Sequence, residues 1–206
     1  MTAPSIHTDL LAYNFNLGTT RFAQHAQPAA ADEKGFFSSV GQSFMHELAR
    51  EGDVLSAEVI LDKGGSIDSP DEEGRRPLHE AAYFGRIDMV RFLLSCGAIM
   101  DAPVHPFGYT ALWFAVAQGH HGIARHLIER GAHIGVVDAL NGQSLLHLAA
   151  ARGDTVMTGM LIAAGIDVLA EDRRGQTARD YAARYNHKDL ERVLMKVMEH
   201  HACYGA

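Results

Sequence analysis

The sequence predicts an all-α fold in which pairs of helices stack side by side, and three observations support this prediction. Similar segments begin at five glycines, Gly41, Gly74, Gly108, Gly142 and Gly175, which are 33, 34, 34 and 33 residues apart. Each segment holds a short apolar run, a glycine or asparagine, and then a second amphipathic run. A glycine follows the second run in the first four segments. Because one helix pair cannot bury its apolar face alone, stacking of similar pairs explains why the sequence repeats.

The first run of each unit carries the signals of a short helix. Hydroxyl side chains that can accept an unpaired backbone N–H precede four of the runs, at Ser43, Thr110, Ser144 and Thr177. The second unit has Arg76 there, and Pro77 follows at the first helical position, where its missing N–H costs nothing. We expect the first helices to end at the glycines at positions 52, 85, 119 and 153, and the second helices at those at 64, 97, 131 and 165. Asn186 replaces the first of these glycines in the fifth unit.

The two ends of the array should differ from its middle, because an end unit has one side without a neighbour. The last predicted helix has a single apolar stripe, formed by Leu190, Val193, Leu194, Val197 and Met198. At the other end, an amino-terminal cap is predicted from Phe36, Phe37, Val40 and Phe44.

Six-residue segments in matching positions of the units resemble the ankyrin-repeat signature T-P-L-H-x-A. They read R-P-L-H-E-A at 76–81, T-A-L-W-F-A at 110–115, S-L-L-H-L-A at 144–149 and, more distantly, S-F-M-H-E-L at 43–48 and T-A-R-D-Y-A at 177–182. The resemblance implies about five ankyrin repeats over residues 38–200, starting near 38, 71, 105, 139 and 172. The predicted domains are a flexible or loosely docked leader over 1–35, the repeat domain over 36–200 and a tail over 201–206.

Composition limits the classes of function. The net charge of −7 argues against nucleic acid as the main partner, since phosphate binding needs a surplus of Lys and Arg. No apolar stretch approaches the roughly 20 residues that cross a bilayer. With only two cysteines and no signal-peptide pattern, we expect a cytoplasmic protein. Secretion without a cleaved signal is the alternative.

No catalytic or metal motif is present, so we expect no enzyme activity, no cofactor and no metal. The patterns G-x-S-x-G, G-x-x-x-x-G-K and H-E-x-x-H are all missing. Adjacent histidines such as His120 and His121 point in different directions on a helix and make poor joint ligands. For His46, His79 and His147, the ankyrin resemblance implies a structural hydrogen-bonding role between repeats.

The resemblance also implies two contact zones, the hairpin tips and the concave face of the first helices. The candidate partner-binding residues that follow by alignment are Tyr83, Phe84, Phe107, Tyr109, Arg50, Glu51, Gln118, Arg152, Asn141 and Tyr185. We predict that the first four form a central apolar anchor, flanked by Arg50 and Glu51 on one side and by Arg152 and Arg184 on the other. The alternative is that one or two of these rings pack inside the domain or against the leader.

Two residues depart from the repeat pattern. Trp113 takes the place of the motif histidine, either to fill space between units or to be exposed on the concave side; we favour packing. Gly159 interrupts a second helix at a position expected to be exposed, where it costs about 1 kcal/mol relative to Ala. The sequence offers no reason for Gly159.

The resulting hypothesis is a non-enzymatic protein-binding protein, either an adaptor or an inhibitor that neutralises a cognate enzyme or toxin, and a monomer in the absence of its partner. The alternative is a secreted effector, with the leader as export segment, that binds a protein in another cell. An enzyme or a histidine-based metal protein is disfavoured for want of a catalytic constellation.

Overall fold

The computed structural model describes residues 44–204 of the 206-residue chain, with side chains through His201. The leader, Ser43, and the predicted cap residues Phe36, Phe37 and Val40 lie outside the described residues. A helical segment over 44–51 comes first. The helices that follow are α3 (Val54–Asp62), α4 (Pro77–Tyr83), α5 (Ile87–Ser95), α6 (Ala111–Gln118), α7 (His121–Glu129), α8 (Leu145–Arg152), α9 (Thr155–Ala163), α10 (Ala178–Arg184) and α11 (Lys188–Tyr204).

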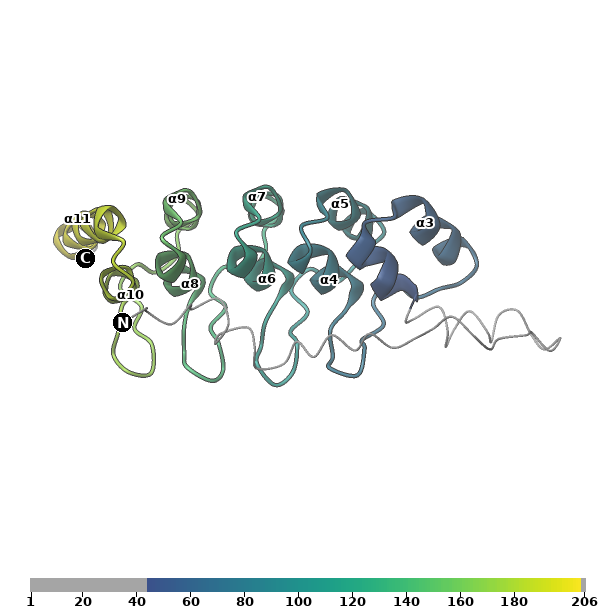
Figure 1. Ribbon diagram of the computed structural model, residues 1–206, viewed down its shortest axis with the longest axis horizontal. Helices are drawn as coiled ribbons and strands as arrows, with labels where there is room; N and C mark the ends of the chain where they lie inside the picture. The colour runs from purple at the N-terminus through teal and green to yellow at the C-terminus, as the bar shows by residue number, and fades with distance from the viewer. Residues whose placement is uncertain (1–43, 205–206) are drawn as a thin grey trace, which may run out of the picture. The chain divides into compact units, whose positions relative to one another are not determined.

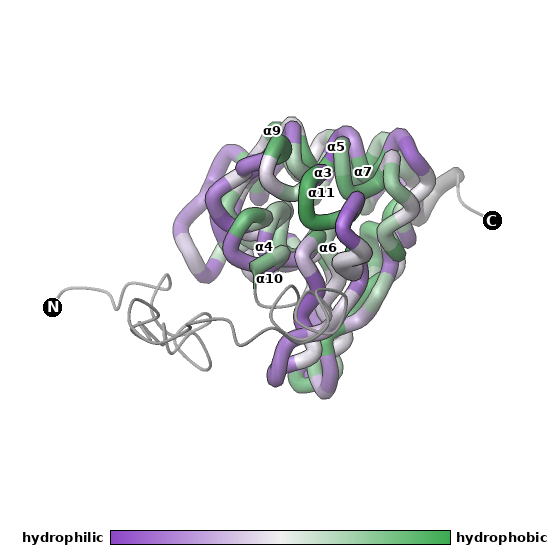
Figure 2. The backbone as a smooth tube through the Cα atoms, turned by 90° about the vertical axis from the view of Figure 1, so that its right-hand side faces the viewer, coloured by the Kyte–Doolittle hydropathy of each residue, from purple (hydrophilic) through white to green (hydrophobic). Residues whose placement is uncertain are grey.

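The helices of the described residues form two rows (Figure 1). The helices α4, α6, α8 and α10 make an inner row, and α3, α5, α7, α9 and α11 make an outer row. Viewed along the stack, the successive pairs superimpose into two layers (Figure 2). The tips between units contain single β-bridges, between Val104 and Tyr109 and between Val137 and Ser144, and residues 44–204 form no longer strand. The predicted all-α stack of helix pairs is confirmed.

Burial along the inner helices shows which side of each unit meets the next one. Equivalent positions in the first four units hold large apolar side chains that are at most 1% exposed: Met45, Leu78, Leu112 and Leu146. The fifth unit has Arg179 at this position, and it is exposed. This position therefore faces the following unit, and the described stack ends with a polar residue there, as a terminal repeat requires.

The predicted helix starts take the expected geometry in the described units. The Thr110 hydroxyl accepts from the backbone N–H of Trp113 at 3.3 Å, and Pro77 is the first residue of α4. Thr177 and Ser144 lie at the N-caps of α10 and α8. Asn186 adopts φ 63°, the left-handed conformation that glycine supplies in the other units. Capping and turn residues could thus be read from the sequence.

Glycines at the ends of inner helices also make room for the next unit. Gly153 has φ 69°, and a Cβ there would lie 2.5 Å from the His187 ring. The ring sits above this glycine because His187 Nε2 hydrogen-bonds the carbonyl oxygen of Ala151 at 3.1 Å. Arg152 covers Gly119 in the same way. Each such contact ties one unit to the last carbonyls of the preceding inner helix.

The last helix differs from the prediction at one residue. Leu190 and Leu194 are buried, but Val193 is 42% exposed, so its assignment to the apolar stripe is wrong. Val59, at the same helix position in α3, is also exposed, whereas Phe92 and Met160 at this position in α5 and α9 pack partly against the core. The helix runs to Tyr204 and so continues into the predicted tail over 201–206.

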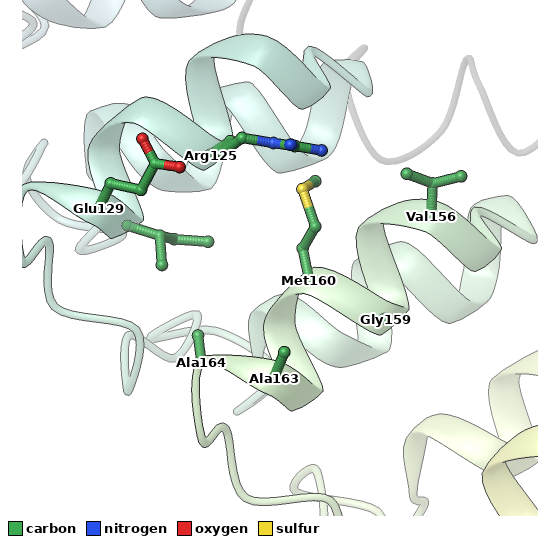
Figure 3. Close-up of a pocket in the computed structure, with 8 residues that line it drawn as sticks. Arg125, Glu129, Val156, Gly159, Met160, Ala163 and Ala164 are labelled. Carbon is green, nitrogen blue, oxygen red and sulfur yellow. The ribbon is translucent and has the colours of Figure 1, made fainter.

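The outer row carries a shallow groove of about 560 Å³ between α7 and α9 (Figure 3). Its walls are formed by Arg125, Ile128 and Glu129 of α7 and by Val156, Gly159, Met160, Ala163 and Ala164 of α9. This groove lies on the opposite row from the predicted binding residues.

Candidate partner-binding surface

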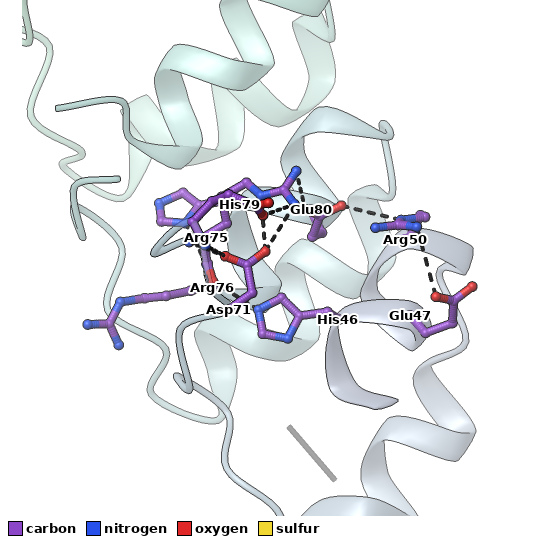
Figure 4. Close-up of polar contacts among 9 residues, drawn as sticks. His46, Glu47, Arg50, Asp71, Arg75, Arg76, His79 and Glu80 are labelled. Atoms are coloured by element: carbon purple, nitrogen blue, oxygen red, sulfur yellow. Dashed lines mark hydrogen bonds and ion pairs between the residues drawn. The ribbon is translucent and has the colours of Figure 1, made fainter. Parts of the chain in front are cut away.

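A buried carboxylate organises the first part of the inner row (Figure 4). The Glu80 side chain is only 1% exposed. Its Oε1 lies 3.1 Å from Arg75 Nη1, and its Oε2 lies 3.4 Å from Arg50 Nε. Because two guanidiniums from different units pair with it, Glu80 fixes how these units pack. Glu80 was not among the predicted site residues; the signal was an acid within the helix-forming segment R-P-L-H-E-A, at the position that holds Phe114 and Leu148 in the next two units.

The same network continues into the first described hairpin tip. Arg75 Nη2 lies 3.0 Å from Asp71 Oδ2 and 2.7 Å from Glu73 Oε2. Burial acts to lower the pKa of Arg75, but the carboxylates of Glu80, Asp71 and Glu73 outweigh it and raise that pKa. Arg75 therefore links the acids of this tip to Glu80 on α4.

The four predicted anchor residues belong to one group of touching rings. We call it the aromatic cluster, and it consists of Tyr83, Phe84, Phe107, Tyr109, Trp113 and Phe114. Phe114 connects its two halves, with ring centroids 6.0 Å from Tyr83 and 6.0 Å from Tyr109. On one side Phe84 lies 5.0 Å from Tyr83. On the other side Tyr109 stacks between Phe107 at 5.4 Å and Trp113 at 4.9 Å.

Exposure divides the aromatic cluster into a base and a surface. Trp113 and Phe114 are 5% and 7% exposed, whereas the four predicted residues are half-buried. The preferred packing role of Trp113 is therefore confirmed. The Tyr109 hydroxyl donates to Asp138 Oδ1 at 3.3 Å, and burial raises the pKa of this phenol. The surface rings thus pack within the domain and still keep part of their area open to solvent. Phe114 was not among the predicted site residues, although it directly follows Trp113 in the sequence.

The predicted flanking residues lie on both sides of the aromatic cluster. The Arg50 guanidinium lies 5.4 Å from the centre of the Phe84 ring, and Glu51 is exposed on the same helix. On the far side, exposed Arg152 donates to the carbonyl oxygens of Ala117 at 2.8 Å and Gln118 at 3.3 Å.

Three other predicted residues are placed less directly at the anchor. Gln118 is half-buried, and its Nε2 has no hydrogen-bond partner among the described residues. Asn141 lies in a tip, where its Nδ2 donates to Asp138 Oδ2 at 2.9 Å. Tyr185 lies 6.4 Å from Tyr181 in a separate pair of rings on the last unit, and the Arg184 guanidinium covers Tyr181 at 5.2 Å.

The motif histidines link successive units. Nε2 of His46, His79 and His147 lies 2.9, 2.8 and 2.9 Å from the carbonyl oxygens of Arg75, Ala102 and Gln176. Burial lowers the pKa of His79 to about 4 and also lowers the pKa of His147. The structural role implied by the resemblance is what these contacts show. Residues 44–201 contain no cluster of three His, Cys, Asp or Glu side chains suited to a metal ion.

Comparison with known proteins agrees with this architecture. The family model described as ankyrin repeats (3 copies) matches residues 20–104, 45–138 and 112–203. The chain is 32% identical over 136 residues to the nuclear factor NF-kappa-B p105 subunit of Mus musculus, which covers 64% of this chain and 14% of that protein. It is 32% identical over 140 residues to a putative ankyrin repeat-containing protein of Treponema pallidum, covering 68% and 47%. It is 37% identical over 86 residues to ankyrin repeat and SOCS box protein 3 of Homo sapiens, covering 41% and 17%.

The chain spans less than half the length of each of these relatives. Stacked helix pairs, linked by motif histidines, define a repeat protein of the solenoid class. This chain belongs to the ankyrin-repeat family. Ankyrin repeats form a protein–protein interaction module that is generally non-catalytic. Among the described helices, none combines the length and the apolar character needed to span a membrane.

Proposed function

We propose that this protein is a non-enzymatic binding protein that presents its inner row and hairpin tips to a protein partner, with the aromatic cluster as anchor. The supporting observation is that four half-buried rings, those of Tyr83, Phe84, Phe107 and Tyr109, rest on two buried ones. Aromatic side chains are enriched at binding hot spots because they bury a large area at small entropic cost.

The surroundings of the aromatic cluster suit a protein interface. The four half-buried rings pack on the buried rings of Trp113 and Phe114, so little ordering entropy is lost on binding. Arg50, Glu51 and Arg152 form a charged rim, as expected around an apolar centre. An adaptor and an inhibitor would use the same surface, and inhibition includes the neutralisation of one cognate enzyme or toxin.

The test is affinity capture from a lysate of the source cells with three forms of the full chain: wild type, the double variant Tyr83→Ala/Phe107→Ala, and the control Phe44→Ala. Phe44 is 54% exposed and lies outside the aromatic cluster. We expect the double variant to lose a partner that the wild type and the control retain. Thermal melting of each form separates binding from folding. A lower melting temperature with unchanged capture would contradict the proposed anchor.

A further inference from the structure

The outer row has one helix that breaks the pattern of its neighbours. In each outer helix three equivalent positions point outward, and all fifteen residues at these positions are exposed. Four of the helices place at least two charges there. Helix α3 has Leu55, Glu58 and Asp62; α5 has Asp88, Arg91 and Ser95; α7 has Gly122, Arg125 and Glu129; α11 has Asp189, Arg192 and Lys196. Helix α9 has Val156, Gly159 and Ala163.

An uncharged outward face is unusual for a helix on the surface of a repeat array. Surface helices normally place charged or polar residues opposite their apolar stripe. Val156 is nevertheless 56% exposed, and Gly159 and Ala163 are exposed beside it. Among the described outer helices, α9 alone contains no charged residue. This face is built like a contact surface, although nothing in the described residues covers it.

Two glycines point to the close approach of another backbone. Gly122 in α7 and Gly159 in α9 each have open space where a Cβ would be, so packing within the chain does not require them. Each costs about 1 kcal/mol relative to Ala in a helix. They lie on the two helices that border the groove of Figure 3, where the Arg125 side chain extends toward Met160. A helix laid against this surface explains both glycines, because small residues let helix backbones approach each other.

The charges of the groove suit a second copy of this chain. Arg125 and Glu129 are the only charged residues in its walls, and neither forms an ion pair among the described residues. They lie four residues apart on one face of α7. In an antiparallel two-fold contact, Arg125 of each copy therefore meets Glu129 of the other, and the uncharged faces of α9 meet at the centre. The same patch carries no net charge, so it does not repel itself.

We propose that two copies of this chain associate through the outward faces of α7 and α9, around Gly159. The contact is small. Two helices of nine residues, each about 14 Å long and about 10 Å apart, offer roughly 300 Å² of projected face, well below the usual 800 Å² per partner. The dimer is therefore weak and forms at micromolar or higher concentrations. This proposal replaces the expectation of a monomer and does not depend on the function of the inner row.

The first experiment is sedimentation velocity of the full chain from low micromolar to several hundred micromolar, with the variant Gly159→Arg. Arginine occupies this position in α5, α7 and α11, and a Cβ added at Gly159 would have no neighbour within 4 Å, so the variant should fold at least as stably. We expect a concentration-dependent dimer for the wild type and a monomer for Gly159→Arg and for a second variant, Val156→Lys. The matched control Ser95→Arg, on α5, should dimerise like the wild type. A wild type that stays monomeric throughout, or a dimer unaffected by Gly159→Arg, overturns the proposal.

A charge exchange tests the two-fold arrangement itself. Arg125→Glu places like charges opposite each other and should weaken association at least threefold. The double variant Arg125→Glu/Glu129→Arg restores opposite charges across the contact and should recover most of that loss. If the double variant associates no better than the single one, the antiparallel arrangement is wrong.

Discussion

The imidazole of His79 is clamped between two backbone groups: its Nδ1 accepts from the N–H of Arg76 at 2.8 Å, and its Nε2 donates to the carbonyl oxygen of Ala102 at 2.8 Å. Because a backbone N–H can only donate, Nδ1 must be unprotonated and the ring neutral. His147 repeats this arrangement with the N–H of Ser144 and the carbonyl oxygen of Gln176. Each ring thereby joins its own helix start to the entry of the next unit.

Acid should weaken the fold through His79. Burial lowers its pKa in the folded state to about 4, against an unfolded value of 6.5. The unfolded chain therefore binds more protons between these values. The stabilising contribution of neutral His79 is fully present above pH 6.5 and is lost as the pH drops toward 4. The difference corresponds to about 3 kcal/mol. Urea unfolding across this range should show the loss. His79→Gln should reduce the slope of the free energy of unfolding against pH, whereas His105→Gln, at an exposed residue, should leave that slope unchanged. Equal slopes in the wild type and both variants would contradict this role of His79.

Removing the charge of Glu80 should destabilise the first described units. Glu80→Gln leaves the guanidiniums of Arg75 and Arg50 without their shared carboxylate, and we expect a loss of about 2–3 kcal/mol in the free energy of unfolding. Urea denaturation measures this loss. The control Glu72→Gln changes an exposed acid in the nearby tip and should cost less than about 0.5 kcal/mol. Equal effects of the two variants would show that the buried network does not hold the units.

The hydroxyl of Tyr181 should matter more than that of its neighbour. It accepts from Gln143 Nε2 at 2.6 Å and donates to Asp172 Oδ2 at 2.8 Å, and all three residues are buried. Tyr181→Phe leaves two buried polar groups without this partner, so we expect a loss of about 2 kcal/mol in the free energy of unfolding. Tyr185→Phe, at a half-buried residue of the same helix end, should cost less than about 0.5 kcal/mol. Chemical denaturation measures the loss in each variant, and equal losses would contradict the greater role of the Tyr181 hydroxyl.

Two glycines with the same backbone preference should respond differently to alanine. Gly165 has φ 88° and no neighbour within 4 Å of a Cβ, so Gly165→Ala should cost only the left-handed strain of about 1–2 kcal/mol. In Gly153→Ala the new Cβ also displaces the His187 ring and its hydrogen bond to Ala151, which adds about 1 kcal/mol or more. Thermal unfolding compares the two. A smaller loss at Gly153 would mean that the ring moves away freely.

The candidate site was predictable in part. The aromatic residues Tyr83, Phe84, Phe107 and Tyr109 could be placed on the inner row and tips because the repeat gives each position a fixed direction. Their mutual contact could not, because it depends on Phe114, whose ring bridges two units. The role of Glu80 also depends on arginines from different segments of the chain.

The sequence by itself determined the stack of helix pairs and the helix ends inside the array. These features follow from local rules, namely capping, glycine conformation and the period of the apolar residues, which repeat in every unit. The role of the motif histidines was implied by the resemblance to ankyrin repeats. Only the tertiary structure decided which rings touch and which charges are buried. Those properties depend on side chains about 30 residues apart that meet across a unit boundary, and the repeat pattern alone does not specify their identity or their packing.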